Sequence, residues 1–306
     1  MSLYRRGEGY RYIRDRDFEK RISRARRKEG TIAIVAKKKV VTATPTAPIM
    51  GVAKQMIEHK FRRMPITRPG SNQLIGIVTL MDMVDYFGGG TKFQVVVKRY
   101  QGNFFKAANA PVELIMRENP PKITIYDDVE DAVELMLEEK VGVLPVVNEE
   151  EKVVGIITEG DIVRFFAGKI SGTKVGDVMS RNVCYIRDNV TIRTVMQVMV
   201  SSGFRRLPIV DENKKPVGMA SAFSVLKLIT SKEAVGFMQM GKLSELLERS
   251  VKLVTSEEII GIGPDADLGE AATVMFKNKA DCLLVQENGE LVGILTERDL
   301  LRSLAS

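Results

Sequence analysis

Four segments of the chain carry apolar residues at the spacing i, i+3, i+4 and i+7, which forms one apolar stripe along an α-helix. The stripes are Ile49/Val52/Ala53/Met56, Val129/Ala132/Val133/Met136, Ile192/Val195/Met196/Met199 and Leu268/Ala271/Ala272/Met275. The pattern predicts four helices of one kind, each with a single buried face. Asp127 and Glu130, at the start of the second helix, resemble a capping box.

The same short strands surround each predicted helix. A β-rich stretch comes before it, at residues 40–43, 123–125, 183–186 and 259–262. An apolar strand follows it, at residues 64–66, 144–146, 207–209 and 282–284. Turn residues, a second strand and a short apolar helix complete the unit, so we predict an α+β fold of four tandem repeats with the order strand, helix, strand, strand, helix.

The second strand of every copy ends in one recurring motif: a glycine, two apolar residues, a Thr or Ser, two variable residues and an Asp or Ser. Its four versions are GIVTLMD at 76–82, GIITEGD at 155–161, GMASAFS at 218–224 and GILTERD at 293–299. Thr-x-x-Asp at a helix start is typical of a simple N-cap pair. It also suits a ligand, because the hydroxyl and the helix N-terminus offer donors to an anion and the carboxylate can accept both hydroxyls of a ribose. The residues alone leave both interpretations open.

The chain has 306 residues, 44% hydrophobic and 28% charged, which is enough to build two ordinary domain cores. Residues 1–30 form a basic tail with eleven Lys/Arg and five Asp/Glu, and they carry most of the net charge of +7. We predict a first repeat pair at 31–168, with repeats at about 31–88 and 111–168. A second pair is predicted at 172–306, with repeats at about 172–230 and 242–306.

Composition argues against several classes of protein. One histidine and two unpaired cysteines leave little material for a metal site or a catalytic triad, so we predict no catalytic residue, no metal and no enzymatic activity. No run of about 18 apolar residues exists, so no membrane span is expected. Cysteine usage predicts a cytoplasmic protein, and few Cys with many Lys, Arg and Glu fit a thermophilic source.

These repeats resemble the cystathionine-beta-synthase (CBS) domain family, and the resemblance covers nearly all of residues 31–306. Four motifs in register, each after a matching strand and helix, carry it, and the strings FRRMPI and MDMVDYFGGG are similar to archaeal homologues of the AMP-activated protein kinase gamma subunit. The family pairs repeats into Bateman modules, so two modules are expected. The resemblance implies AMP, ADP or ATP as regulatory ligands, no catalytic cofactor, and an energy-state sensor that controls a partner protein.

The resemblance also implies roles for individual residues. The ribose-binding candidates are Asp82, Asp161 and Asp299, with Thr79, Thr158 and Thr296 beside them. In the third copy, Ser221 and Ser224 replace Thr and Asp, and a serine hydroxyl cannot replace a carboxylate on a diol. We therefore expect the third site to be weak, altered or empty.

Phosphate requires cations, and arginine suits it best because its fork matches phosphate oxygens. Arg62 and Arg63 in copy one match Arg205 and Arg206 in copy three, at the position of a phosphate-binding basic pair in the gamma-subunit family. Pseudo-twofold modules would direct the first pair to Asp161 and the second to Asp299. Arg298 is a further phosphate candidate. Solvated arginines at a helix end are the alternative explanation.

Adenine would lie against apolar strand residues and main-chain groups, and the candidate walls are Thr42, Thr44, Ile66, Val146 and Ile209. Core packing explains the apolar ones equally well. S-adenosylmethionine and NAD remain alternative adenosyl ligands, although the arginine pairs favour a phosphate-bearing one. The regulated protein is unidentified, and a homodimer is possible.

A second hypothesis concerns the basic tail. Residues 1–30 interleave tyrosines and a phenylalanine with cations, a composition that can bind DNA or RNA, so a ligand-responsive nucleic-acid-binding regulator is the alternative function. The charge pattern favours a solvated or partner-docking helix over nucleic-acid binding, because short basic N-terminal arms are common.

Overall fold

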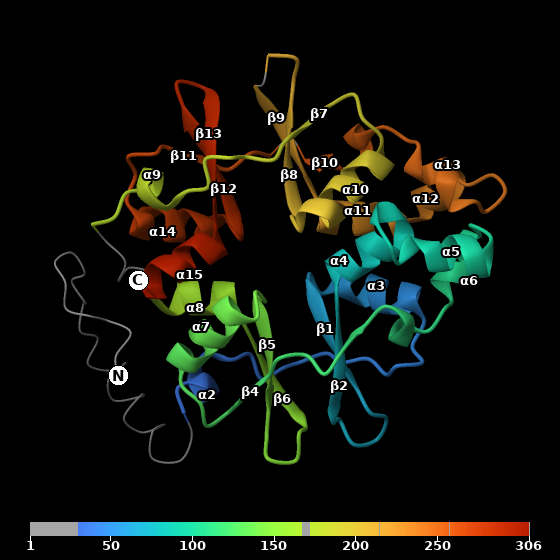
Figure 1. Ribbon diagram of the computed structural model, residues 1–306, viewed down its shortest axis with the longest axis horizontal. Coiled ribbons are helices and arrows are strands. Elements are labelled where there is room, and N and C mark those ends of the chain that lie inside the picture. Colours follow the sequence, from blue (N-terminus) through green and yellow to red (C-terminus); the bar gives the residue numbers. More distant parts are fainter. Residues whose placement is uncertain (1–29, 167–171, 214, 257, 306) are drawn as a thin grey trace. The chain divides into compact units, whose positions relative to one another are not determined.

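The computed structural model describes residues 30–166, 172–213, 215–256 and 258–305, which divide into two compact units (Figure 1). Within these ranges, unit 1 takes the residues up to Val40, those from Pro121 to Val183, and those from Ile260 onward. Unit 2 takes Val41–Pro120 and Cys184–Ile259. Copies two and four therefore share one unit, and copies one and three share the other.

Unit 1 holds the helices and strands of copies two and four. These are α2 (Ile32–Val35), β4 (Ile123–Thr124), α7 (Val129–Glu138), β5 (Val143–Val147), β6 (Val153–Thr158), α8 (Glu159–Phe166), α9 (Val175–Val178), β11 (Gly261–Ile262), α14 (Leu268–Asn278), β12 (Cys282–Glu287), β13 (Glu290–Thr296) and α15 (Glu297–Ala305). Helices α8 and α15 pack against each other, and α7 and α14 both contact this pair.

Unit 2 holds copies one and three together with the connections that follow them. Copy one supplies α3 (Ile49–Glu58), β1 (Arg63–Thr67), β2 (Leu74–Thr79), α4 (Leu80–Val84), a π-helix η1 (Asp85–Gly89), α5 (Phe93–Tyr100), α6 (Phe104–Ala108), a 3-10 turn η2 (Val112–Leu114) and β3 (Arg117–Glu118). Copy three supplies β7 (Ile186–Arg187), α10 (Ile192–Ser202), β8 (Arg206–Val210), β9 (Pro216–Ser221), α11 (Ala222–Ile229), α12 (Lys232–Gly236), α13 (Leu243–Leu247), a 3-10 turn η3 (Val251–Val254) and β10 (Thr255–Ser256).

The predicted strand pattern is confirmed in every copy. The strands on either side of the turn pair antiparallel, as in β5 with β6 and β12 with β13. The β-rich stretch ahead of each helix lies parallel to the first of these strands, as β4, β7 and β11 or, in copy one, as a single bridge between Ala43 and Ile66. The predicted α+β class and the four repeats are therefore confirmed.

The sheet edge in each copy is completed by a segment from elsewhere in the chain. Lys37 pairs antiparallel with Ile156, and Ser180 pairs in the same way with Ile294. In unit 2, β3 lies along β2 and β10 lies along β9. We call these four segments the exchanged segments, because each comes before one repeat and joins the sheet of another.

The glycine of the recurring motif lies where an exchanged segment passes close to the strand. A Cβ on Gly76 would lie 2.7 Å from the sulfur of Met116, and one on Gly293 would lie 2.4 Å from the sulfur of Met179. Both methionines belong to exchanged segments. Both contacts are with the flexible ends of methionine side chains, so a larger residue at either position would require the methionine to shift.

The four apolar stripes lie on α3, α7, α10 and α14, and all their members are buried. The capping box expected from Asp127 and Glu130 was wrong by one residue. Asp128 is the N-cap of α7 and Asp131 completes the box. The Asp127 carboxylate instead accepts from the amide and hydroxyl of Thr124, so it closes the preceding turn.

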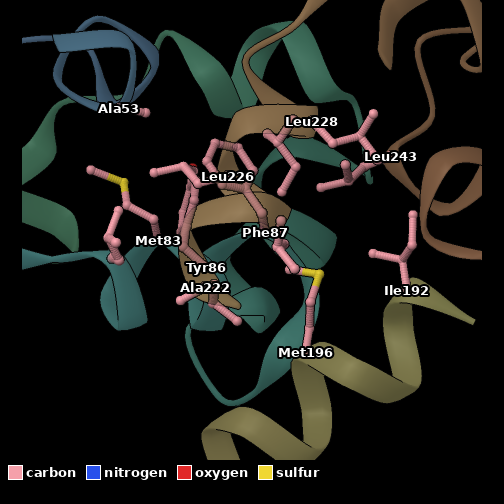
Figure 2. Close-up of a cluster of buried hydrophobic side chains, with 14 of the residues drawn as sticks. Ala53, Met83, Tyr86, Phe87, Ile192, Met196, Ala222, Leu226, Leu228 and Leu243 are labelled. Carbon is pink, nitrogen blue, oxygen red and sulfur yellow. The ribbon is translucent and has the colours of Figure 1, made fainter. Parts of the chain in front are cut away.

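Each unit has its own hydrophobic core. The core of unit 2 contains Tyr86, Phe87 and Phe104, and Figure 2 shows Tyr86 and Phe87 beside Met83, Met196 and Leu226. In unit 1, the buried core members that the structure describes are Ile, Val, Leu, Met and Ala. The units group copy one with three and copy two with four, whereas the predicted modules group neighbours along the chain, and that modular pairing stays a prediction.

Candidate ligand-binding sites

The last strand of copy two ends at a threonine that caps the following helix. The hydroxyl of Thr158 donates to Oδ2 of Asp161 at 2.6 Å, and its amide donates to the same oxygen at 3.1 Å. In return, the amide of Asp161 donates to Thr158 Oγ1 at 3.2 Å. This capping box satisfies amides that a helix start would leave unpaired, and it fixes the carboxylate at the end of β6.

The same contacts recur in two further copies. In copy four, the hydroxyl and amide of Thr296 donate to Oδ2 of Asp299 at 2.7 and 2.8 Å. In copy one, those of Thr79 donate to Oδ2 of Asp82 at 2.6 and 2.8 Å. The structure thus brings each candidate threonine to its candidate aspartate. The cap uses one carboxylate oxygen, Oδ2, so a ribose role for these residues depends largely on the other oxygen and stays a prediction.

The second oxygen, Oδ1, has a different neighbour in each copy. In copy two, it accepts from Lys37 Nζ at 2.7 Å. In copy one, it accepts from the Lys92 ammonium. In copy four, the cation that the structure describes nearest to Asp299 Oδ1 is Arg302, with its Nη1 at 3.9 Å.

Burial increases the importance of these neighbours. The Asp161 and Asp299 side chains are 5% and 6% exposed, whereas the Asp82 side chain is 19% exposed. A carboxylate removed from water is stable only with donors or cations around it. Asp161 and Asp299 are therefore suited to bind a group that brings hydrogen-bond donors.

Copy three keeps the cap without a carboxylate. Ser221 Oγ accepts from the amide of Ser224 at 3.0 Å, and the Ser224 hydroxyl lies 2.6 Å from the carbonyl oxygen of Val254, to which it donates. That carbonyl belongs to η3, next to exchanged segment β10. The expectation of a weak, altered or empty third site stays a prediction.

Both candidate arginine pairs belong to unit 2 and lie beside the motif of their own repeat. Arg63 pairs with Thr79 across β1 and β2, and the amide of Leu80 donates to the carbonyl of Arg62. Arg206 pairs with Ser221, and Arg205 accepts from Ala222 in the same way. Their assignment to the phosphates of ligands at Asp161 and Asp299 stays a prediction.

Arg298 makes a contact that the sequence did not suggest. Its Nε donates to Oε1 of Glu159 at 2.8 Å, which joins the first turns of α15 and α8 within unit 1. The Glu159 side chain is 2% exposed and that of Arg298 is 30% exposed. One edge of this guanidinium is therefore already hydrogen-bonded to the protein, and its phosphate-binding role stays a prediction.

The adenine-pocket candidates lie in the strands. Ile66, Val146 and Ile209 are at most 1% exposed and belong to the two cores, so packing alone accounts for their apolar character. Thr42 and Thr44 are half-buried, and the Thr42 hydroxyl lies 3.3 Å from that of Thr67. Their contact with adenine stays a prediction.

Sequence reasoning missed three residues at these helix starts: Lys37, Lys92 and Glu159. Lys37 is 124 positions from Asp161, and only the exchanged segment brings the two together. Lys92 lies in the connection after copy one, which has no equivalent motif elsewhere. Glu159 is one of the variable residues of the motif, and nothing in the sequence indicated that it would lie beside Arg298.

Two findings limit other kinds of site. Among the described residues, no group of three or more His, Cys, Asp or Glu side chains is arranged to hold a metal ion. In the same part of the chain, no helix is long and apolar enough to cross a membrane. The basic tail and its nucleic-acid hypothesis fall almost entirely on residues outside the described ranges.

A family model for the CBS domain matches four stretches of the chain, residues 32–89, 112–168, 175–231 and 251–306. The chain belongs to the CBS-domain family. Each matched stretch ends with the helix that the motif caps, or just beyond it. The recognition made from the four motifs is thereby confirmed.

One relative is similar over most of its length. Protein MJ1225 of Methanocaldococcus jannaschii is 35% identical over 274 residues, which cover 89% of this chain and 98% of that protein. Its crystal structure, described as that of a candidate archaeal homologue of g-AMPK, superposes with a TM-score of 0.85 at 34% identity, covering 89% of this chain and 99% of the other.

Two more distant proteins extend the comparison. A 33.4 kDa protein from a ribosomal RNA operon of Thermofilum pendens is 28% identical over 256 residues, covering 84% of this chain and 85% of that protein. A conserved protein from Pyrococcus horikoshii has a TM-score of 0.58 at 22% identity, over 89% of this chain and 99% of the other, and shows the shared fold alone.

Proposed function

We propose that the protein binds adenine nucleotides at the capped helix starts of copies one, two and four, and that it acts as a non-enzymatic regulator of a partner protein. The observation that carries the proposal is the recurrence of a buried, threonine-held aspartate at the start of the final helix. Asp161 and Asp299 keep this arrangement almost atom for atom.

A helix cap alone explains the threonine better than the aspartate. Ser221 and Ser224 cap α11 equally well without a charge, so capping does not require the desolvated carboxylates of the other copies. A ribose diol supplies two neutral donors, and Asp299 Oδ1, whose nearest described cation is Arg302 at 3.9 Å, is suited to accept from them. The similarity to a candidate g-AMPK homologue over nearly the whole chain supports AMP, ADP or ATP as the ligand.

Regulation follows only if the ligand distinguishes between states of the protein. A nucleotide that prefers one arrangement shifts the population toward it by its difference in binding free energy, and a partner protein responds to that shift. The regulatory class and the absence of enzymatic activity are part of this proposal.

The test is isothermal titration calorimetry of the nucleotide-stripped protein with AMP, ADP and ATP, with S-adenosylmethionine as the comparison ligand. We expect micromolar binding of nucleotides and its loss in the triple variant Asp82→Asn/Asp161→Asn/Asp299→Asn. Asparagine keeps an acceptor for the threonine hydroxyl, so the cap survives this change. Ser224→Ala, in the copy without a carboxylate, is the matched control and is expected to leave binding unchanged.

The ribose contact itself has a sharper test. Wild-type protein should bind AMP more tightly than 2′-deoxy-AMP by about ten-fold, the value of one hydrogen bond to a charged group. This preference should shrink in the Asp→Asn variant. If the variant binds both ligands as wild type does, the aspartates are helix caps and the proposal fails.

A further inference from the structure

Two of the exchanged segments place different residues at one structural position. Lys37 and Ile156 exchange backbone hydrogen bonds of 2.9 and 3.0 Å, and Ser180 and Ile294 exchange bonds of the same two lengths. Asp161 lies five residues after Ile156, and Asp299 lies five residues after Ile294. Lys37 and Ser180 are therefore equivalent with respect to the two buried aspartates.

This difference decides what each carboxylate contacts. The Lys37 ammonium reaches Oδ1 of Asp161 at 2.7 Å, and its side chain is 55% exposed. Ser180 is too short to make the equivalent contact. Among the described cations, only Arg302 of the same helix lies near the Asp299 carboxylate, with its Nη1 at 3.9 Å from Oδ1.

In copy one, the cation at the carboxylate oxygen Oδ1 comes from another part of the chain. The Lys92 ammonium binds Oδ1 of Asp82 and also donates to the carbonyl of Ile115 at 2.8 Å. Its side chain is 30% exposed, so it is held more firmly and from more sides than Lys37. Displacing it would break two hydrogen bonds rather than one.

A ribose hydroxyl that donates to Oδ1 must compete with these lysines. A hydrogen bond between charged groups is stronger than one from a neutral hydroxyl, so the ligand gains less at an occupied carboxylate than at an open one. The competition does not depend on a phosphate and should act on any ligand that carries the diol.

We propose that Lys37 and Lys92 are internal competitors that rank the three sites, with Asp299 filling first, Asp161 second and Asp82 last. The proposal rests on the proposed function, because it assumes that these aspartates bind ribose. It makes Lys37 and Ser180 determinants of affinity, although neither lies in the recurring motif.

The experiment uses adenosine, because a neutral ligand separates competition at the carboxylate from attraction of phosphate to lysine. Lys37→Ser is measured in full-length Asp82→Asn/Asp299→Asn protein, which keeps only the Asp161 site. Ser180→Lys, the reverse change, is measured in Asp82→Asn/Asp161→Asn protein, which keeps only the Asp299 site. Both positions are exposed, so neither change is expected to disturb folding, and melting temperatures verify this.

We expect Lys37→Ser to tighten adenosine binding by about ten- to a hundredfold and Ser180→Lys to weaken it by a similar factor. Lys92→Met in protein that keeps only the Asp82 site should also tighten binding. Unchanged adenosine affinity in Lys37→Ser and Ser180→Lys would overturn the ranking while leaving the proposed function intact. Weaker AMP binding by Lys37→Ser, with adenosine unaffected, would make Lys37 a phosphate ligand and also overturn it.

Failure of the proposed function looks different. In that case wild-type protein binds neither adenosine nor AMP, and both the function and the ranking are rejected together. Binding by wild-type protein that vanishes in all three single-site proteins also rejects the ranking, because it would show that the sites do not act separately.

Discussion

Units 1 and 2 are built from the same repeat, yet the helices that pack together in each unit begin with different chemistry. In unit 1, α8 begins with Glu159, which pairs with Arg298 at the start of α15. In unit 2, α4 begins with Leu80 and α11 with Ala222, which are 4% and 1% exposed. The capping residues stay nearly constant, so the residues just inside the cap determine whether packed helices are joined by charge or by apolar contact.

The cores differ in a related way. Unit 2 buries Tyr86 and Phe87 in its π-helix, and Gly89 lets this helix approach α10 at close range, since a Cβ there would lie 2.7 Å from the carbonyl of Met196. Unit 1 fills the described part of its core with aliphatic residues and methionine. Ligand candidates with buried carboxylates lie in unit 1, whereas the aromatic core and the arginine pairs lie in unit 2.

The largest effect is expected from removing an aromatic side chain of unit 2. Phe87→Ala should lower the free energy of unfolding by about 3–5 kcal/mol, because it leaves a cavity in a core that buries Phe87 completely. Chemical denaturation measures this loss. Phe204→Ala is the control, since Phe204 is 48% exposed, and its cost should stay within about 0.5 kcal/mol. Equal costs would contradict the aromatic core of unit 2.

The ion pair of unit 1 comes next. Arg298→Met should cost about 2–3 kcal/mol, because it leaves the Glu159 carboxylate buried without its cation. The double variant Glu159→Gln/Arg298→Met should recover much of that loss in the same denaturation experiment. If the double variant is as unstable as the sum of the single ones, the two side chains do not act as a pair.

The caps should cost less and should separate folding from binding. Thr158→Ala in unit 1 and Ser221→Ala in unit 2 each remove an N-cap hydroxyl, and each should cost about 0.5–2 kcal/mol in thermal unfolding. Only Thr158→Ala should also weaken nucleotide binding, because only Thr158 positions a carboxylate. A matching loss of binding from Ser221→Ala would contradict the distinction between copies two and three.

The smallest effect concerns the Tyr86 hydroxyl, which donates to the carbonyl of Ala107 at 3.0 Å. Tyr86→Phe should cost about 0.5–1.5 kcal/mol at neutral pH. Burial raises the pKa of Tyr86 above its ordinary value of about 10, so its contribution is present below that pH and is lost as the pH rises. The difference between wild type and variant should therefore shrink in alkaline denaturation series, and a constant difference would contradict a buried, neutral Tyr86.

Local signals predicted much of this molecule. The i, i+3, i+4, i+7 stripes identified α3, α7, α10 and α14, because a helix that buries one face must repeat at 3.6 residues. The recurring motif identified the capped final helices, because Thr-x-x-Asp makes its contacts within one turn. Both kinds of signal depend on residues that are close in sequence.

The remaining features depend on pairings that no local pattern encodes. Lys37 meets Asp161 only because an exchanged segment joins a strand more than 100 positions away, and its register is determined by the tertiary structure. The capping box expected at Asp127 was wrong because Asp127 and Asp128 are adjacent. Either aspartate fits the N-cap position of a helix that begins near Val129. Arg298 had a plausible phosphate role in sequence, and only the packing of α8 on α15 revealed Glu159 beside it.

The exchanged segments also bear on how the chain is made. A ribosome releases copy two long before copy four, yet unit 1 draws on residues near 37, on 121–183 and on 260 onward. Unit 2 can close once Ile259 has been made, whereas unit 1 needs the last repeat. Copy two therefore stays partly assembled while about 140 further residues are translated, for about 7–28 seconds at roughly 5–20 residues per second. Premature termination after copy three would leave α7 and α8 without α14 and α15 to cover them, which makes such fragments natural substrates for chaperones and proteases.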